Sequence, residues 1–523
     1  MINENDDAYQ YNRCSSRGIC SINPATASLQ EIILIYLKCA AYYGLKSEEC
    51  EVHDKRIRNL VLNTISVLSS NYEISEINFD MINSAFKKEL PAIINDIKKV
   101  CSVKEFTEAN NILNTGADLK DYIRYGEREF NRRLKNVSLQ ERSLYRVLFV
   151  LVKSLCINIL IYESFGKESD EEVLSIYRVL NLLNTPEVDR EQIIKNIYDI
   201  SEKDCHMMTR IREVQEECYG EQEEREISFS TKKGKALLVV GSNLRELEQI
   251  LNIFKEKDID VYTHDNMILA HTFPGFEKYK NLKGQFGHGM ENCLLDFSTF
   301  PGPIIFTRHS LFNVENLYRG ILYTTDFSYS KGVIQIKNND FAEVVKSVEG
   351  SKGFKTGKIC DSEKAGFSYI KIMAKIKEKT EKEKYDRIVL IGLGGYLPEE
   401  KEYFQTFIKH APQNVLIISL FYCESKENVI CIHAKNDIYG MNRLFDGVLK
   451  TFSRKITLFF PYADRHTLSD VIHLSKKYEA KIYVGSWNQS VMKPDIADSL
   501  KITFGINIAT TPKNDLNNIT DVK

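Results

Sequence analysis

The sequence predicts a multidomain α + α/β fold, in which a helical N-terminal domain is followed by two Rossmann-like α/β domains. From about Ser28 to Arg225 apolar residues recur at intervals of three and four, the period of amphipathic helices. Beyond this region short apolar runs alternate with amphipathic segments, which is typical of parallel strands joined by helices. The length of 523 residues also exceeds what a single hydrophobic core organises and favours several domains.

The helical domain is predicted to span residues 1–225. Its most continuous apolar segments are LQEIILIYLKCAAYYG at 29–44 and LYRVLFVLVKSLCINILIY at 144–162. The second segment contains Arg146 and Lys153, so its uncharged runs are much shorter than the ~20 residues that cross a bilayer. We therefore expect a buried helix and no insertion into a membrane.

A charged stretch without periodicity, GEQEEREISFSTKKGK at residues 220–235, is predicted to be a linker or an exposed hinge. The first α/β domain is predicted at 234–375. It opens with ALLVVGS, a short apolar run as expected for a strand buried on both faces, and an amphipathic helix follows. Further apolar runs predict strands at 258–264, 303–309 and 320–326.

The second α/β domain is predicted at residues 376–523. Its first strand lies in KYDRIVLIGLGG at 384–395, and the segment EEKEYFQTFIKHA supplies the helix after it. Later apolar runs predict strands at 414–422, 480–486 and 501–507. The alternation of strands and helices indicates a doubly wound sheet in each of these two domains.

Composition narrows the classes of function. The 70 basic and 72 acidic side chains give a net charge of −2, which offers no concentrated positive surface for nucleic acid. The opening MINENDDAYQYNR is acidic and polar, whereas a secretory signal begins with basic residues and continues with an apolar segment. We expect a cytoplasmic protein, and we expect most of its 12 cysteines to be small buried hydrophobic residues.

The most specific motif lies at residues 261–310. It contains VYTH, the pair Ala270-His271, GQFGHGMEN and FPGP. This combination resembles the hybrid-cluster protein family, also called the prismane or hydroxylamine reductase family, and the resemblance spans nearly the whole chain. The resemblance implies a helical domain that carries a four-iron cluster near its N-terminus. It also implies two α/β domains that enclose an iron, sulfur and oxygen cluster, which reduces small nitrogen compounds.

The resemblance also implies that most ligands of these clusters are replaced in this chain. Of the two N-terminal cysteine pairs only the second has a counterpart, Cys14 and Cys20, so we expect a half-site that holds no cluster. At the larger cluster, the positions for histidine, carboxylate and cysteine ligands fall on Ser242, Asn266, Ser310, Gly394 and Tyr422, although a shift of one residue would put Cys423 in the place of Tyr422. The last carboxylate falls on Pro461 or, in a shifted register, on Asp464, and one cysteine has no counterpart nearer than Lys450.

These replacements predict a degenerate member of the family without an iron–sulfur cofactor. Serine, asparagine, glycine and tyrosine are poor substitutes for thiolates, because iron and sulfide favour soft donors. The leading hypothesis is a protein that keeps the fold for binding, assembly or regulation, with a second copy of itself or a paralogue as its partner. The sequence leans against an enzyme.

Two alternatives stay open. The first is a divergent oxidoreductase of the hydroxylamine reductase type, in which Cys14 and Cys20 of two chains hold a 4Fe-4S cluster and Cys423 and Asp464 contribute elsewhere. The second is a ligand sensor that binds a small molecule at the carboxyl ends of its strands, the usual site in open α/β sheets.

Several histidines are candidates for other chemistry. The resemblance places His264 and His271 in the framework of the motif, so we expect structural hydrogen bonds from both. His288 and His309 have no counterpart in the family pattern. With Asp265 and Cys293 they form a candidate site for a small divalent ion.

The remaining candidates have simpler interpretations. The Gly392-x-Gly394-Gly395 turn follows a strand, but Leu397 occupies the place of the third glycine of a dinucleotide fingerprint. Cys39 and Cys50 could replace the missing N-terminal cysteines, although Cys39 lies in an apolar helix and reads as a core residue. Three further residues that could carry chemistry lie on a predicted helix among charged residues, where we expect them on a solvated or packed face. They are Cys205, His206 and Cys218.

Overall fold

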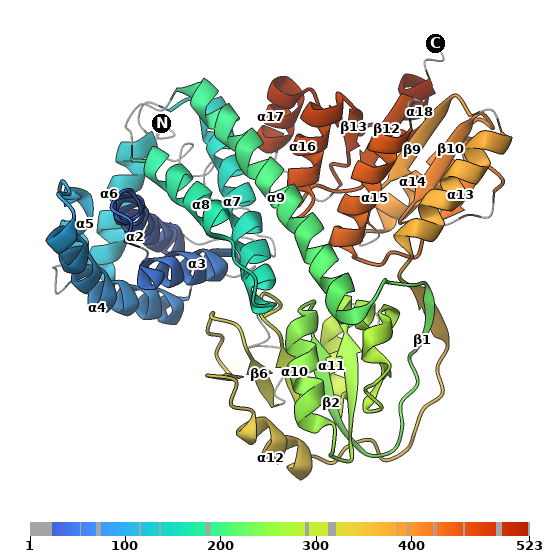
Figure 1. Cartoon of the computed structure of the whole chain (residues 1–523), viewed down its shortest axis with the longest axis horizontal. Coiled ribbons are helices and arrows are strands. Elements are labelled where there is room, and N and C mark those ends of the chain that lie inside the picture. Colours follow the sequence, from blue (N-terminus) through green and yellow to red (C-terminus); the bar gives the residue numbers. More distant parts are fainter. Residues whose placement is uncertain are drawn as a thin grey trace, which may run out of the picture. The chain divides into compact units, whose positions relative to one another are not determined.

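The chain is described by a computed structural model, and its fold is the predicted one, with helices first and two parallel α/β sheets after them (Figure 1). Two compact units are present, residues 1–203 with 327–329 and residues 204–326 with 330–523. The described residues are 24–52, 54–69, 75–113, 117–134, 137–184, 189–287, 292–311, 321–383, 385–394, 397–421, 424, 426–452, 455–487 and 494–520.

The described part of the first unit consists of helices whose apolar faces form a common core. Their ends follow local capping rules. At the start of α7 (Leu139–Ser164), the Ser138 and Glu141 side chains each accept a hydrogen bond from the other residue's backbone N–H. The other helices are α2 (Pro24–Glu49), α3 (Lys55–Ser69), α4 (Glu76–Val100), α5 (Thr107–Leu113), α6 (Leu119–Leu134), α8 (Asp170–Leu182) and the first part of α9 (Arg190–Tyr219).

Helix α7 is the segment expected to be a buried helix. By length and composition alone it could cross a membrane, but 72% of its most apolar window is buried inside the protein. Its inner face packs against α3 and α8, and Cys156 on that face is fully buried. The apolar surface that a bilayer would cover is therefore covered by neighbouring helices.

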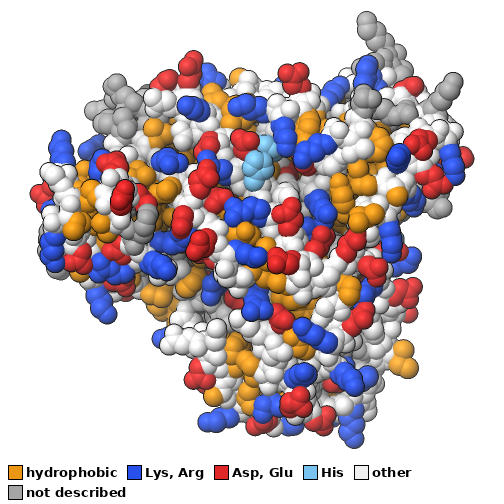
Figure 2. All heavy atoms as spheres, in the orientation of Figure 1, with side chains coloured by type: hydrophobic (Ala, Val, Ile, Leu, Met, Phe, Trp, Pro, Cys, Tyr) orange, Lys and Arg blue, Asp and Glu red, His pale blue; other side chains and the backbone are white. Residues whose placement is uncertain are grey.

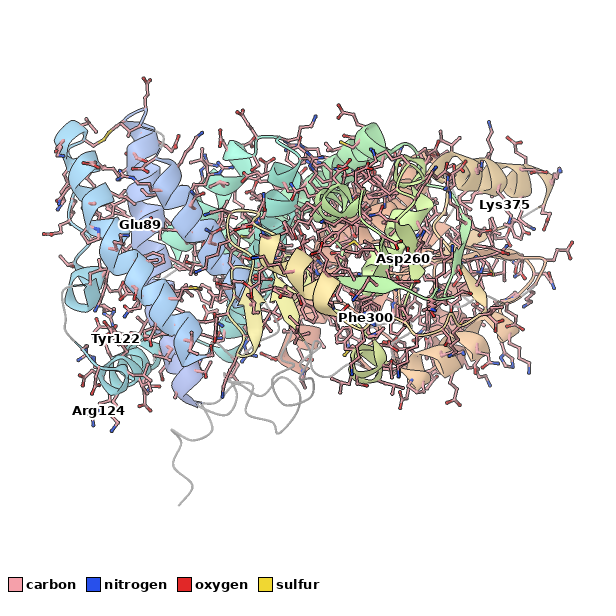
Figure 3. The ribbon with its side chains drawn as sticks, turned by 90° about the horizontal axis from the view of Figure 1, so that it is seen from below. Glu89, Tyr122, Arg124, Asp260, Phe300 and Lys375 are labelled. Carbon is pink, nitrogen blue, oxygen red and sulfur yellow. A yellow bond between two sulfur atoms is a disulfide. The ribbon has the colours of Figure 1, made fainter. Side chains whose placement is uncertain are left out.

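Helices α2 and α6 approach each other closely. A Cβ atom on Gly126 of α6 would lie 2.1 Å from the backbone oxygen of Ser28 on α2. A bidentate ion pair joins Arg133 of α6 to the nearly buried Glu31 of α2, with both N–O distances at 2.8 Å. Nearby on α6, the Tyr122 ring (Figure 3) lies edge-on to Phe79 with ring centroids 5.3 Å apart.

The cysteines of this unit differ in part from expectation. Cys39 is buried in α2, which confirms that it is a core residue. Cys50 and Cys101, which follow the carboxyl ends of α2 and α4, form a disulfide across a sequence separation of 51 residues. Local sequence does not reveal this pair, because only the packing of α2 beside α4 brings the two helix ends together.

The second unit contains two six-stranded parallel sheets, each with the strand order of a doubly wound fold. The first sheet has the order β4-β3-β2-β5-β6-β7 and the second has β11-β10-β9-β12-β13-β14. In both, the direction of winding reverses at the centre, between β2 and β5 and between β9 and β12. The central strands are almost fully buried, which explains why their sequences are continuous apolar runs.

The first sheet and its helices occupy residues 235–350. The elements in chain order are β2 (Lys235–Val240), α10 (Leu244–Phe254), β3 (Ile259–His264), the 3-10 helices η1 (Asp265–Thr272) and η2 (Pro274–Phe276), β4 (Leu282–Gln285), α11 (Cys293–Thr299), β5 (Ile304–Phe306), β6 (Leu322–Thr324), β7 (Val333–Gln335) and α12 (Ala342–Gly350).

The second sheet and its helices follow. The elements are α13 (Tyr369–Lys382), β9 (Arg387–Ile391), α14 (Pro398–His410), β10 (Val415–Ser419), β11 (Val429–Cys431), α15 (Ile438–Thr451), β12 (Lys455–Phe460), α16 (Leu468–Tyr478), β13 (Lys481–Val484), α17 (Pro494–Phe504), β14 (Asn507–Ile508) and α18 (Pro512–Thr520).

Two sequence predictions are wrong in detail. The expected linker at 220–235 contains β1 (Arg225–Ser228), which pairs antiparallel with the distant β8 (Ser362–Ala365). The expected strand at 501–507 is largely the end of α17, and only Asn507–Ile508 is a strand. Gly505 adopts φ +66° just after this helix, as is common for a residue that ends one.

We predict that Gly126→Ala destabilises the helical unit by about 1–3 kcal/mol, because the new methyl group would overlap the backbone of α2. Hydrogen exchange followed by mass spectrometry should show faster exchange in α2 and α6. Gly350→Ala is the matched control, since no atom lies within 4 Å of its added Cβ. Equal exchange in both variants would contradict the prediction.

Candidate functional site

The positions singled out by the sequence lie at the two places where the sheets reverse their winding. Ser242 and Ser310 follow the neighbouring strands β2 and β5, and Gly394 and Asp464 follow the neighbouring strands β9 and β12. Parallel strands present their carboxyl ends at one edge of a sheet, where ligands of doubly wound folds bind. The structure therefore places four positions singled out through the family resemblance at recognised binding edges.

The turn after β2 is shaped by a glycine. Gly241 has φ +127°, and a Cβ atom there would lie 2.2 Å from the Thr307 hydroxyl. The hydroxyl of Ser310 lies 2.6 Å from the backbone oxygen of Thr307 and 3.1 Å from that of Val240, so it donates within the turn. This hydroxyl fastens the end of β5 to the end of β2.

Asp464 is also engaged in local structure. Its Oδ1 accepts hydrogen bonds from the backbone N–H groups of His466 and Thr467 at 2.8 and 3.0 Å. These bonds order the turn between β12 and α16.

Two positions singled out in the first sheet are accessible to solvent. Ser242 is exposed, and Asn266 on η1 is partly exposed.

The turn after β9 has no room for a side chain at Gly394. A Cβ atom there would lie 2.6 Å from Cβ of Pro461, which follows β12. The glycine pattern at 392–394 is thus explained by close approach of two strand ends. Pro461, one of the two positions considered for the last carboxylate, fills the space in front of this turn.

A group of charged and imidazole side chains surrounds these turns. We name Glu246, Arg308, His309, Asp326, Arg465 and His466 the strand-end cluster. Burial lowers the pKa of His309, and the charges of Arg308 and Arg465 lower it further. Arg308 follows β5 and Arg465 follows β12, so charged residues from the carboxyl ends of both sheets act on His309.

The imidazoles of the strand-end cluster are neutral near pH 7. Burial and the adjacent Arg465 lower the pKa of His466 to about 4. The Arg465 guanidinium donates from Nε to Nε2 of His466 at 2.9 Å, which fixes that nitrogen as an acceptor. The cluster therefore combines charged guanidinium groups with uncharged histidines.

Two carboxylates hold the cluster in place. Glu246 accepts from the Arg308 backbone N–H at 2.9 Å and from the Thr325 hydroxyl at 2.5 Å, and burial raises its pKa. Asp326 accepts from the backbone N–H of His309 at 2.7 Å. His309 has φ +67°, a conformation that proteins tend to keep at functional sites.

The two framework histidines form hydrogen bonds, as the sequence predicts. His264 is fully buried, and its Nε2 lies 3.1 Å from Oδ2 of Asp296. His271 Nε2 lies 2.9 Å from the Thr263 hydroxyl, which donates to Oε1 of Gln285 at 2.6 Å. His271 is therefore the donor to Thr263, and burial lowers its pKa to about 4.

The metal hypotheses receive no geometric support from the described residues. Within the ranges given above, no group of three or more His, Cys, Asp and Glu side chains could hold a metal ion. The charges of Asp296 and Asp265 both act on Cys293, whose pKa burial raises to about 11. Six residues named from the sequence lie outside the described residues, namely Cys14, Cys20, His288, Gly395, Tyr422 and Cys423.

Sequence reasoning missed five members of the strand-end cluster. Glu246 lies in the first turn of α10 and Asp326 ends the predicted strand at 320–326. Arg308 follows β5, and Arg465 and His466 follow β12. Their one shared signal is a position just after a buried parallel strand, or at the start of the helix that follows it. Applied to every strand, the rule that ligands bind at carboxyl ends would have identified them.

Comparisons with known proteins agree with the motif. A sequence model of the Prismane/CO dehydrogenase family matches residues 10–424. The chain is 23% identical to a hydroxylamine reductase of Thermodesulfovibrio yellowstonii, over 97% of this chain and 98% of that protein. It is 25% identical to a hydroxylamine reductase of Methanococcus vannielii, over 96% and 97%. Carbon monoxide dehydrogenase IV from Carboxydothermus hydrogenoformans aligns with a TM-score of 0.47 at 12% identity, covering 100% of this chain and 95% of that one.

We predict that His271 makes the protein sensitive to acid. Its folded pKa of about 4 lies below the ordinary 6.5, so the unfolded chain binds a proton more readily below pH 6.5. Stability should fall by up to about 3 kcal/mol as the pH drops from 6.5 to 4. His271→Gln keeps a donor and should reduce this loss in urea unfolding, whereas the exposed His410→Gln should not. An unchanged pH profile for His271→Gln would refute the assignment.

Proposed function

The chain belongs to the Prismane/CO dehydrogenase family, and from this premise we propose that it is a member without the iron–sulfur–oxygen cluster, in which the strand-end cluster serves binding. The family resemblance assigns cluster ligands to the carboxyl ends of the central strands. The support for the proposal comes from Gly394, which has no room for a side chain, and from Ser310 and Asp464, whose oxygens are bonded to the backbone.

The observation that carries the proposal is the contact between Gly394 and Pro461. The family resemblance puts a persulfide-bearing cysteine at Gly394, but any side chain there would overlap Pro461. Restoring a single cysteine would therefore not restore a ligand, because Pro461 of the opposing strand end occupies the space that its side chain needs. The residues present do not fit the hybrid cluster at this corner.

The other described positions favour the same conclusion. The Ser310 hydroxyl is bonded to backbone oxygens, and Asp464 Oδ1 is bonded to backbone N–H groups. Ser310 offers no thiolate sulfur, the donor that such clusters favour, and the Asp464 carboxylate already accepts backbone N–H groups at Oδ1. The fit would require several turns to change conformation together.

The strand-end cluster suits a small polar molecule. Arg308 and Arg465 offer planar sets of N–H donors, and His466 adds an uncharged imidazole ring. Such a site suits recognition, and we assign no reaction to it. We place the protein in the cytoplasm, with a second copy or a paralogue as its partner. On the face drawn in Figure 2, basic and acidic side chains are interspersed, which favours a protein partner over nucleic acid.

The proposal predicts that anaerobically purified protein contains far less than one iron and one acid-labile sulfide per chain. Metal analysis and the visible absorption spectrum measure this directly. An iron–sulfur protein expressed in the same cells is the control for cofactor supply. Hydroxylamine consumption with an artificial electron donor should stay at the rate of the reagents alone.

A stoichiometric iron–sulfur chromophore would contradict the proposal. The double variant Cys14→Ser, Cys20→Ser then locates the metal. Loss of the chromophore in this variant would point to the N-terminal half-site and to the divergent oxidoreductase. Retention would point to donors around the strand ends.

A further inference from the structure

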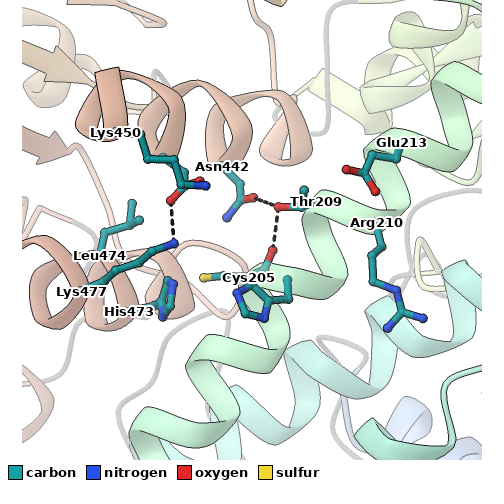
Figure 4. A pocket seen from close by; sticks show the side chains of 11 residues that line it. Cys205, Thr209, Arg210, Glu213, Asn442, Lys450, His473, Leu474 and Lys477 are labelled. Carbon is teal, nitrogen blue, oxygen red and sulfur yellow. Dashed lines mark hydrogen bonds and ion pairs between the residues drawn. The ribbon is translucent and has the colours of Figure 1, made fainter. Parts of the chain in front are cut away.

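A second candidate site lies in the C-terminal unit, away from the strand-end cluster. The part of α9 within this unit lines a pocket together with α15 and α16, and its volume is about 340 Å³ (Figure 4). This is near the lower end of the range for small-molecule sites. It shares no residue with the strand-end cluster. Among the described residues that line it, Leu474 is the one aliphatic side chain.

Two lysines from different helices meet at one carboxylate on the pocket wall. Lys450 of α15 and Lys477 of α16 lie 2.5 and 2.9 Å from the Asp446 carboxylate. The Tyr478 hydroxyl donates to the same group at 2.6 Å. Burial alone would raise the pKa of Asp446, but these donors outweigh it and lower the pKa to about 2. This part of the pocket wall is therefore organised around the ionised carboxylate of Asp446.

The pocket has an excess of positive charge. Three basic side chains line it, namely Lys450, Lys477 and Arg210. The acidic side chains in the lining are Asp446 and Glu213. The histidine rings of His206 and His473 lie 5.8 Å apart and add further N–H groups. A bound anion would interact with the ammonium groups of Lys450 and Lys477, which both contact Asp446.

The floor of the pocket is fixed by buried hydrogen bonds. The Thr209 hydroxyl donates to Oδ1 of Asn442 at 3.0 Å, and the Asn442 amide donates to Asp470 at 2.6 Å. The Cys205 thiol lies 3.4 Å from the same Asp470 oxygen. Burial, with the nearby Asp470, raises the pKa of Cys205 well above its usual value, so the sulfur is a thiol and not a nucleophile. The pocket is equipped to bind and not to react.

We propose that this pocket binds the phosphate group of a small molecule. A compact oxyanion with up to two negative charges matches a small opening whose donors are two ammonium groups, a guanidinium and imidazole N–H groups. A divalent cation is disfavoured by Lys450, Lys477 and Arg210.

The first experiment measures binding of inorganic phosphate and of pyrophosphate by isothermal titration calorimetry at low ionic strength. We expect saturable binding with one site per chain. Lys477→Gln should weaken it about tenfold, because one charge-assisted contact is lost. Lys476→Gln is the matched control, since it removes the same charge from the exposed neighbouring residue outside the pocket. It should change affinity by less than about twofold.

A second variant tests the sign of the effect. Asp446→Asn releases both ammonium groups from the carboxylate, so it should tighten phosphate binding about fivefold. Circular dichroism checks that this variant is folded, and Lys450→Gln, expected to weaken binding, replaces it if it is not. Vesicles containing phosphatidic acid distinguish a lipid headgroup from a soluble phosphate as the source of the ligand. The proposal is overturned if neither phosphate probe binds saturably, or if Lys477→Gln and Lys476→Gln behave alike.

Discussion

The reversal of winding at the centre of each parallel sheet is the constraint on which the rest of the molecule depends. It brings the carboxyl ends of β2 and β5 together in one sheet and those of β9 and β12 in the other. At both places the strand ends come so close that a glycine is required. Gly241 makes room for Thr307, and Gly394 makes room for Pro461. The side chains that occupy the space around Gly241 and Gly394 therefore determine what these turns can bind.

In this chain the space is filled by the protein itself. The side chains near the turns are short or are tied to the backbone, and the charges that remain belong to arginines and carboxylates. Burial keeps His309 and His466 neutral, which limits the repulsion from the adjacent Arg308 and Arg465. The charges of the strand-end cluster are thus balanced within the protein. The two sheets are held by their own buried apolar strands.

The two proposed binding regions follow different physical designs. The strand-end cluster places its charges among buried turns, where each is compensated by a partner from another strand end. The pocket beside α9 places lysines at a partly open wall and keeps its buried floor uncharged at Cys205 and Asn442. A ligand at the first region must replace internal contacts, whereas a ligand at the second meets charges still accessible to water. Charges in the second region are therefore more exposed to screening by salt.

The sequence by itself determined the class of fold and the family, because both are written in local patterns. Helical periodicity, buried apolar runs and the motif at residues 261–310 each lie within a short stretch of chain. It also singled out Ser242, Ser310 and Gly394 as positions to which the family resemblance assigns cluster ligands. The pairing of β1 with β8 and the disulfide between Cys50 and Cys101 could not be read in this way.

Only the tertiary structure decided what the replaced positions do. The contact of Gly394 with Pro461 joins two strand ends that are separated in the sequence by two helices and two strands. The strand-end cluster and the lysine pair at Asp446 likewise join different elements. From the sequence, Cys205 and His206 are predicted to lie on an ordinary helix face. The structure shows that they line a pocket together with residues of α15 and α16. The physical reason is that periodicity reports which side of an element is buried, while the partner across a turn or a pocket is set by packing alone.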